Sequence, residues 1–527
     1  MAIDHPVAQR LARAASLLAA ATVASRLLGV VREIVNASFF GAANDKAAYV
    51  IGYYVPYFIQ RLLLGGTLSI VFIPTITEYL TRGDREETAR VSAILFNLVL
   101  LLGVGIVLVG EVVAPLLVRI AAPGFQAQAG LIPLAVRLTR IIFVAMLFLA
   151  LAIFATGFLQ AHQRFTAPAL APLLFNLVII AGTLWLGPAD RLGIQGLAVA
   201  WVGGTAAQFF VQIPAMRRAG FTYRPVLWLG HPAVRKFVRL ALPAMLGLAV
   251  LEINTNVSRF FASFLPATAH VNAVAVLDYA YEVMQAPVGI IAISMATAIF
   301  PTLARQAARE DPGLRATTAF GLRIVLVLIL PVVGLVLALA HPLVRVLFQR
   351  GEFTPEATVA VAAVLRAYTL GLGAIAVYYM MTRAFYALEE MVTPVKVGAG
   401  MVLLNGVLAY LLMRPLGAPG IALATSTVNL CSTTLLLWLL RRRIGGFEGG
   451  RIAATTVRAG AAAALAGIAA AGVGAVAGSG GDTLSTFLQL AAAGGAGAAV
   501  YLLVCLALRV EEIQAIRDLL LRRAPVD

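Results

Sequence analysis

Long apolar runs alternate with short polar connections along the whole chain. About fourteen of these runs reach the roughly 20 residues that a helix needs to cross about 30 Å of hydrocarbon. We find no ten-residue stretches of alternating apolar and polar residues, the pattern of a membrane strand, and lipid admits only helices or closed barrels. The pattern predicts an all-α integral membrane protein with spans near 15–40, 46–80, 91–118, 133–160, 167–187, 194–214, 237–265, 270–304, 318–341, 357–388, 393–413, 418–440, 456–478 and 484–508.

Composition agrees with this pattern. Of the 527 residues, 61% are hydrophobic and only 12% are charged, which excludes an ordinary water-soluble globule. Cys431 and Cys505 are isolated within apolar segments, so they predict neither a disulfide framework nor a metal cluster. We find no nucleotide-binding loop that would indicate a built-in ATP motor.

Basic residues gather in every second connection, and this bias predicts that both termini are cytoplasmic. The rich connections hold Arg82, Arg85, Arg90, Arg164, Arg217, Arg218, Arg224, Arg235, Lys236, Arg305, Arg309, Arg315, Arg441, Arg442, Arg443 and Arg451. The poor ones hold Lys46, Arg119, Arg191, Arg345, Arg350 and Arg414. Because the arginines lie in the connections between spans, they explain the net charge of +16, and we do not expect a nucleic-acid partner.

The chain contains an internal duplication. "FIPTITEY" at 72–79 resembles "IFPTLARQ" at 299–306, and "LGIQGLAVA" at 192–200 resembles "LGAPGIALA" at 416–424. Copies of six spans each share one orientation and are parallel repeats. We predict an N-terminal six-helix lobe, a cytoplasmic connection, a C-terminal six-helix lobe, two extra spans and a cytoplasmic tail, at 1–214, 215–236, 237–440, 441–508 and 509–527.

Several charged residues fall inside the predicted spans. Arg26, Arg32 and Glu33 lie in the first span and Arg61 in the second, and the repeat carries Arg32 onto Arg259. Ionisable residues within a membrane are costly unless they face a bundle interior or water. We therefore expect a hydrated cationic cavity, whereas the plainer alternative is a set of structural ion pairs between helices. Asp45, between the first two spans, is either a gate charge or a solvated loop acid.

Motifs across both halves resemble the MurJ/MviN family of lipid II flippases, within the multidrug/oligosaccharidyl-lipid/polysaccharide exporter superfamily. They are "SRLLGVVREIVNASFFGA", "FIPTITEY", "RFFASFL", "DYAYEVMQAP", "FQRGEFT" and "RAFYALEEMVTPV". The resemblance implies two six-helix lobes around a V-shaped cavity and a final helix pair that forms a groove for a lipid tail. It implies a bacterial inner-membrane flippase for undecaprenyl-pyrophosphate-linked disaccharide pentapeptide, with Arg26, Arg32, Glu33 and Arg61 lining the cavity.

The chain departs from this family at two places. Glu282 stands where family members commonly have an arginine, and we expect it to pair with Arg259 or Arg32. Ser258 and Ala409 stand where some members are thought to have sodium-coupling acids. Asn405 and Thr425 are weak ion candidates, and coupling to the membrane potential or to a cation stays open.

Three functions compete. The first is a lipid II flippase that works by alternating access, with lipid II and membrane lipids as partners, no cofactor and a monomeric state. The second is a flippase or exporter of another lipid-linked oligosaccharide or of a small molecule; drug cations would need carboxylates in place of the arginine cluster. The third, an integral-membrane glycosyltransferase, would need acids on a sizeable outer loop, and the outer connections are short. A transporter rather than an enzyme is therefore expected.

Overall fold

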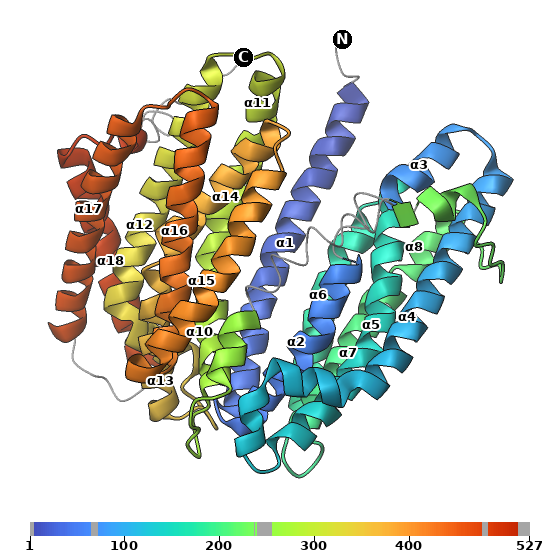
Figure 1. Cartoon of the computed structure of the whole chain (residues 1–527), viewed down its shortest axis with the longest axis horizontal. Coiled ribbons are helices and arrows are strands. Elements are labelled where there is room, and N and C mark those ends of the chain that lie inside the picture. Colours follow the sequence, from blue (N-terminus) through green and yellow to red (C-terminus); the bar gives the residue numbers. More distant parts are fainter. Residues whose placement is uncertain (1–4, 65–71, 237, 240–255, 477–482, 515–527) are drawn as a thin grey trace. The chain divides into compact units, whose positions relative to one another are not determined.

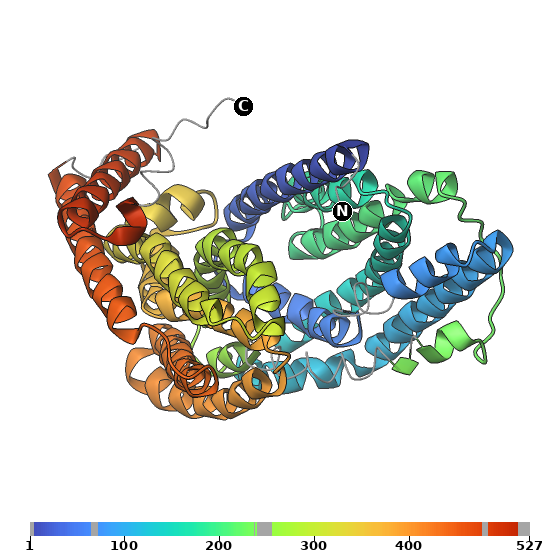
Figure 2. The ribbon, with the colours of Figure 1, turned by 90° about the horizontal axis from the view of Figure 1, so that it is seen from above.

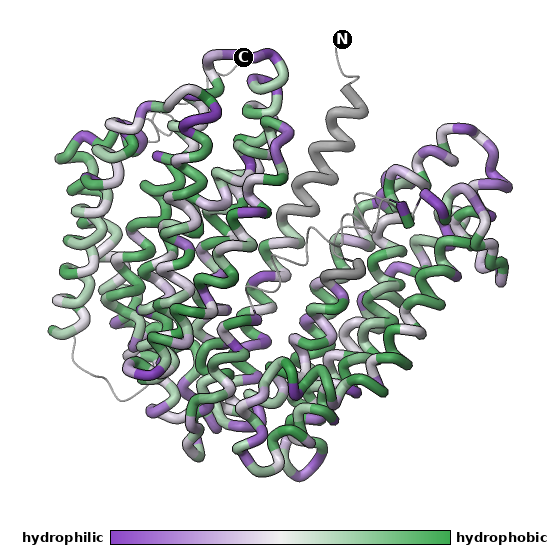
Figure 3. The backbone as a smooth tube through the Cα atoms, viewed as in Figure 1, coloured by the Kyte–Doolittle hydropathy of each residue, from purple (hydrophilic) through white to green (hydrophobic). Residues whose placement is uncertain are grey.

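The computed structural model describes residues 5–64, 72–236, 238–239, 256–476 and 483–514, and it describes side chains from residue 20 onward, except those of 61–64. Every regular element of these residues is helical, as the hydropathy pattern predicts. Hydrophobic residues run along the bodies of the helices, and hydrophilic residues gather at their ends (Figure 3).

The chain divides into two compact units (Figure 1). Unit 1 comprises Met1–Phe264 with the short stretches Thr268–His270 and Arg350–Phe353. Its helices are α1 (His5–Phe40), α2 (Asn44–Leu64), α3 (Ile73–Thr81), α4 (Arg85–Ala121), the 3-10 helix η2 (Pro123–Ala127), α5 (Leu131–Ala161), α6 (Thr166–Leu186), α7 (Ile194–Phe210) and α8 (Ile213–Arg218).

Unit 2 comprises Leu265–Ala267, Val271–Gln349 and Thr354–Asp527. Its helices are α10 (Ala273–Pro287), the π-helical η3 (Val288–Ile293), α11 (Ser294–Ala308), α12 (Gly313–Phe348), α13 (Pro355–Thr369), α14 (Leu372–Ala387), α15 (Val392–Leu416), α16 (Ala418–Arg443), α17 (Gly449–Val476) and α18 (Thr483–Ala507). The boundary between the units, near Phe264, falls later in the chain than the predicted lobe boundary. The repeat-based division and the cavity between lobes stay predictions, since each unit is described by itself.

Ten helices among the described residues are long and apolar enough to cross a membrane, or eleven if α13 and α14 count as one span bent by 45°. The predicted span 357–388 is this bent pair. The predicted spans 46–80 and 237–265 include residues outside the described part, so the total of fourteen stays a prediction.

Backbone conformation reproduces the duplication. Gly193 and Gly417, which precede α7 and α16, have φ of 55° and 62° and ψ of −136° and −138°. A residue with a Cβ atom rarely adopts this conformation, which explains a glycine at both positions. Further pairs of positive φ lie 226 or 227 residues apart, at Gly83 and Glu310, Gln163 and Glu389, and Gly220 and Gly446.

Within unit 2, the last two helices pack along α12. Figures 1 and 2 show α17 and α18, at the red end of the colour scale, side by side, and α17 lies beside α12. A side chain at Gly334 of α12 would collide with the backbone of Ala463 in α17. The close approach that the small residues of this segment predict is therefore present.

Candidate functional site

A cluster of charged side chains lies where α1 meets the start of α2 and the middle of α6. Arg32 donates from Nε and Nη2 to Oε1 of Glu33, at 3.1 and 2.9 Å. Lys46, in the first turn of α2, donates from Nζ to the other carboxylate oxygen of Glu33 at 3.3 Å. The side chains of Arg32, Glu33 and Lys46 are only 15%, 13% and 2% exposed. Two cations and one anion leave this cluster with a net charge of +1.

Lys46 was expected in a connection between spans, and this expectation was wrong. The helix α2 begins at Asn44, so that Lys46 lies in its first turn and is buried. Such burial is tolerated because Glu33 supplies a charged partner. The signal in the sequence is the apolar run that follows Lys46 directly, "AAYVIG", which places the lysine on a buried helix.

Arg32 is held from α6 and α7 as well. Its Nη1 donates to Oδ1 of Asn176 at 3.1 Å, and Asn176 in turn donates to the backbone oxygen of Ser25 at 3.3 Å. The guanidinium carbon lies 5.9 Å from the ring centroid of Phe175 and 5.5 Å from that of Trp201. Aromatic faces attract a cation at such distances. Sequence reasoning missed Asn176, Phe175 and Trp201, because only the packing of α1 on α6 and α7 makes them neighbours of Arg32.

Arg26 has a different environment from Arg32. It lies 14 residues before the end of α1, about 21 Å at 1.5 Å per residue, whereas Glu33 lies about 10 Å from that end. Its side chain is exposed, and within the described ranges it makes no hydrogen bond or ion pair. Of the charged residues predicted in the first span, Arg26 is therefore the one whose donors are not engaged by neighbouring protein groups.

The remaining cationic candidates lie on α2 and on the helical residues that precede Phe264. Arg259 is 5% exposed, and its guanidinium carbon lies 3.2 Å from the ring centroid of Tyr54 in α2. Neighbouring Ser258 is also buried. Arg61 belongs to α2, but its side chain lies outside the described residues. The structure thus brings Arg259 against α2 and leaves the side chain of Arg61 unassigned.

The weaker candidates come from several helices. Asp45 is exposed in the first turn of α2, and Glu282 is exposed on α10. Asn405 is fully buried in α15, and Thr425 of α16 donates to the carbonyl oxygen of Ile421 at 3.3 Å. Where side chains are described, no three His, Cys, Asp or Glu residues lie together as a metal site would require. These four candidates thus lie on four different helices, α2, α10, α15 and α16.

Comparison with known proteins gives one family. The family model described as "Lipid II flippase MurJ" matches residues 36–491. A "Probable lipid II flippase MurJ" of Synechocystis sp. is 33% identical over 452 residues, which is 83% of each chain. A "Lipid II flippase MurJ" of Burkholderia cenocepacia is 29% identical, over 81% of this chain and 83% of that protein.

Solved structures agree on the fold. A structure titled "Lipid II flippase MurJ, inward closed conformation" aligns with a TM-score of 0.76 at 23% identity, over 94% of this chain and 99% of that one. An inward-facing multidrug transporter of the MATE family aligns with a TM-score of 0.68 at 16% identity, over 80% of this chain and 94% of that one. From the family-model match and the Synechocystis relative, we conclude that this chain belongs to the MurJ lipid II flippase family.

Proposed function

We propose that this chain moves lipid II, the undecaprenyl-pyrophosphate-linked peptidoglycan precursor, from the cytoplasmic to the outer leaflet of a bacterial inner membrane. The observation that carries the proposal is the match of the lipid II flippase model to residues 36–491. The cationic character of α1 and α2 supports it, since a pyrophosphate requires charge-assisted donors and arginine keeps its proton in a cavity of low dielectric.

Within this proposal Arg26 makes the first contact with the pyrophosphate. Neighbouring groups of the described chain do not take up its donors. The cluster of Arg32, Glu33 and Lys46 adds a positive potential further along the same helix while Glu33, Asn176 and the two aromatic rings hold Arg32 in place. Arg61 and Arg259 complete the proposed site. Asp45, Ser258, Asn405 and Thr425 remain candidates for a gate or for an ion.

The same cluster disfavours an exporter of cationic drugs. Glu33 is the one acidic residue between His5 and Asn44, and both of its carboxylate oxygens accept bonds from cations. A carboxylate saturated in this way offers little attraction to a second cation. Export of another lipid-linked oligosaccharide would use the same arginines and is the alternative that we keep.

Transport assays separate these cargoes. Vesicles that contain only this protein receive either fluorescently labelled lipid II or a quaternary ammonium dye, and protection of each label from an external quencher is followed over time. We expect the label on lipid II to change sides and the dye to stay. Movement of the dye without movement of lipid II would refute the proposal.

We further propose that the protein acts as a monomer with both termini in the cytoplasm, and that Glu282 pairs with Arg259 or Arg32 when no cargo is bound. A cargo pyrophosphate would compete for the arginine and so shift the equilibrium between conformations. In that case Glu282→Gln changes the distances between spin labels placed on the two units. Unchanged distance distributions, with and without lipid II, would leave Glu282 with no part in the transition.

A further inference from the structure

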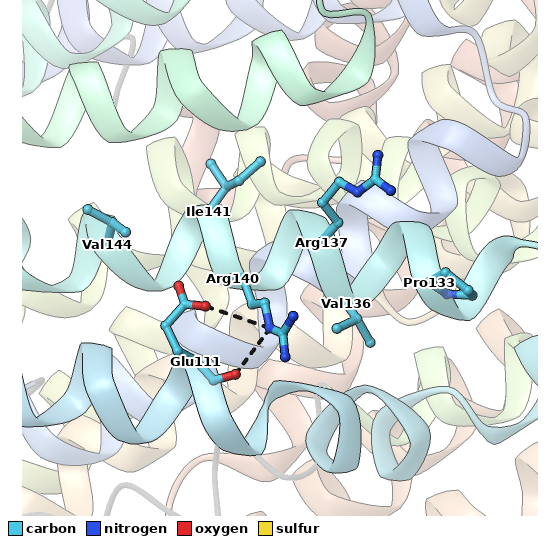
Figure 4. Close-up of a pocket in the computed structure, with 7 residues that line it drawn as sticks. All are labelled: Glu111, Pro133, Val136, Arg137, Arg140, Ile141 and Val144. Atoms are coloured by element: carbon cyan, nitrogen blue, oxygen red, sulfur yellow. Dashed lines mark hydrogen bonds and ion pairs between the residues drawn. The ribbon is translucent and has the colours of Figure 1, made fainter.

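A second group of charged side chains lies on α4 and α5, apart from the cluster at Arg32. Glu111 of α4 and Arg137 and Arg140 of α5 line a cavity of about 530 Å³, which apolar side chains between Pro133 and Val144 complete (Figure 4). The side chains of Glu111 and Arg140 are 39% and 48% exposed. Arg140 and Glu111 form an ion pair at 3.6 Å, but all three charged side chains remain accessible to a ligand, to water or to a headgroup.

The position of the cavity along the spans matches the level of lipid headgroups. Residues 141–161 of α5 contain no charged side chain, and these 21 residues rise about 31 Å. Residues 91–110 of α4 are likewise uncharged and rise about 30 Å. Since the hydrocarbon layer is about 30 Å thick, Arg140 and Glu111 lie at its boundary.

The cavity faces away from α2. Leu138 and Thr139 of α5 pack against Gly52 of α2. Successive residues of a helix are rotated by about 100°, so Arg137 and Arg140 point to the other side of α5. On α4, Leu108 and Val112 flank Glu111 and are 63% and 78% exposed, as side chains in contact with lipid are. The cavity is thus separate from the proposed cargo site, and apolar surface adjoins it.

The duplication shows which of these contacts the fold requires. Arg140 donates from Nε to the carbonyl oxygen of Glu111 at 3.1 Å, and Arg366 donates from Nε to that of Leu337 at 3.2 Å. Both residues of the second pair lie 226 positions after those of the first. In α4 this carbonyl has lost its helical donor, because Pro115 stands four residues later. The contact of Arg140 is therefore a fold feature that both repeats share.

Arg137 and the carboxylate of Glu111 have no such structural role. The same offset of 226 carries Arg137 onto Ala363 and Glu111 onto Leu337, so the second repeat forms the same helix pair without either charge. Oε2 of Glu111 lies 3.6 Å from Nε of Arg140, and within the described part of the chain the carboxylate accepts no hydrogen bond. These two charges are additions to unit 1 that packing alone does not explain.

We propose that this cavity binds the headgroup of an aminophospholipid of the phosphatidylethanolamine type. Two guanidinium groups match a phosphate, and one carboxylate matches a primary ammonium group. Figure 4 shows Arg140 directed toward Glu111 while Arg137 projects from the other edge of α5. The phosphate binds the terminal nitrogens of Arg140 and the exposed guanidinium group of Arg137, and the ammonium group donates to Glu111. The acyl chains lie along the exposed apolar face of α4.

Lipid titration with mass spectrometry of the intact protein tests this proposal. The full chain, in detergent, receives phosphatidylethanolamine, phosphatidylcholine or phosphatidylglycerol with identical acyl chains. We expect phosphatidylethanolamine to bind about tenfold more tightly than the other two, because a trimethylated amine cannot donate to Glu111 and phosphatidylglycerol has no ammonium group. Arg137→Gln weakens this binding about tenfold. Glu111→Gln abolishes the preference for the ethanolamine headgroup.

Arg119→Gln is the matched control, since Arg119 is exposed in the last turn of α4 but does not line the cavity. It should bind all three lipids as the unsubstituted protein does. Arg140 is left intact because the fold uses it, and unchanged thermal unfolding midpoints confirm that the variants fold. Equal affinity for the three headgroups, tightest binding of phosphatidylglycerol, or equal losses in Arg119→Gln and Arg137→Gln would overturn the proposal. None of these results depends on the transport of lipid II.

Discussion

Replacing Lys46 with Met tests whether the buried cluster stabilises unit 1. The lysine nitrogen lies 3.3 Å from Oε2 of Glu33, and the lysine side chain is 2% exposed. At that distance two unit charges attract by about 5 kcal/mol for an effective dielectric constant of 20. Removing one partner of a buried pair costs about 3–5 kcal/mol, and Arg32 still faces Glu33 in the variant. We therefore expect Lys46→Met to lower the free energy of unfolding by about 3 kcal/mol.

A double-mutant cycle with Glu33→Gln isolates the interaction between the two charges. The double variant lacks both the lysine and the carboxylate charge, so that neither of them is buried without its partner. Its loss of free energy of unfolding should therefore be smaller than the sum of the two single losses, by about 2 kcal/mol or more. Unfolding in mixed detergent micelles, followed by circular dichroism, supplies the four free energies. Arg451→Met is the control, because Arg451 and Glu448 are 63% and 40% exposed and such a pair contributes less than about 1 kcal/mol. If Lys46→Met is no more costly than this control, or if the single losses add, the stabilising role of the cluster is refuted.

Three further predictions concern transport and helix packing. Arg26→Ala should reduce lipid II transport at least about tenfold while the unfolding midpoint stays unchanged. Arg26→Lys should restore part of the transport, because lysine keeps the charge but loses the planar guanidinium group. Normal transport by Arg26→Ala, measured beside the control Arg119→Ala, would show that Arg26 is not part of the site. Tyr501→Phe should cost about 1–3 kcal/mol, because the Tyr501 hydroxyl donates at 2.6 Å to the carbonyl oxygen of Val327, which Pro331 deprives of its helical donor. Tyr223 is exposed, so Tyr223→Phe should not measurably change the free energy of unfolding in the same assay. Equal losses in Tyr501→Phe and Tyr223→Phe would contradict this account. Gly334→Leu should lower the free energy of unfolding by about 1–3 kcal/mol, because α17 lies against Gly334. Gly400→Leu should not lower it, because a side chain at Gly400 would meet no atom within 4 Å. Similar unfolding midpoints for the two variants would show that α17 does not need this close contact.

Hydropathy predicted most of the helices well, because each lipid-exposed span is a single continuous apolar segment of the sequence. Thus 133–160 corresponds to Leu131–Ala161 and 418–440 to Ala418–Arg443. The bend between Thr369 and Leu372 was not predicted, since the apolar run continues through it. The duplication was visible in short motifs, and the matching backbone angles of Gly193 and Gly417 follow from it.

The site was predicted only in part. Charge within a span marked Arg32 and Glu33, because ionisable residues are rare there. The partners that hold Arg32 and Glu33 in place could not be predicted from local sequence. Asn176 lies 144 residues after Arg32, and the sequence alone did not show that α2 begins at Asn44 and so includes Lys46. The structure also separates Arg26 from the ion pairs of Arg32. The structure thus shows ion pairs at Arg32, as the plainer alternative expects, whereas the hydrated cavity stays a prediction.

The most direct test of the central claim is the initial rate at which labelled lipid II crosses the bilayer of vesicles that contain only this protein, in one orientation. The account predicts a rate well above that of protein-free vesicles, which falls at least about tenfold in Arg26→Ala. A rate equal to that of protein-free vesicles, with folded and correctly oriented protein, would contradict it.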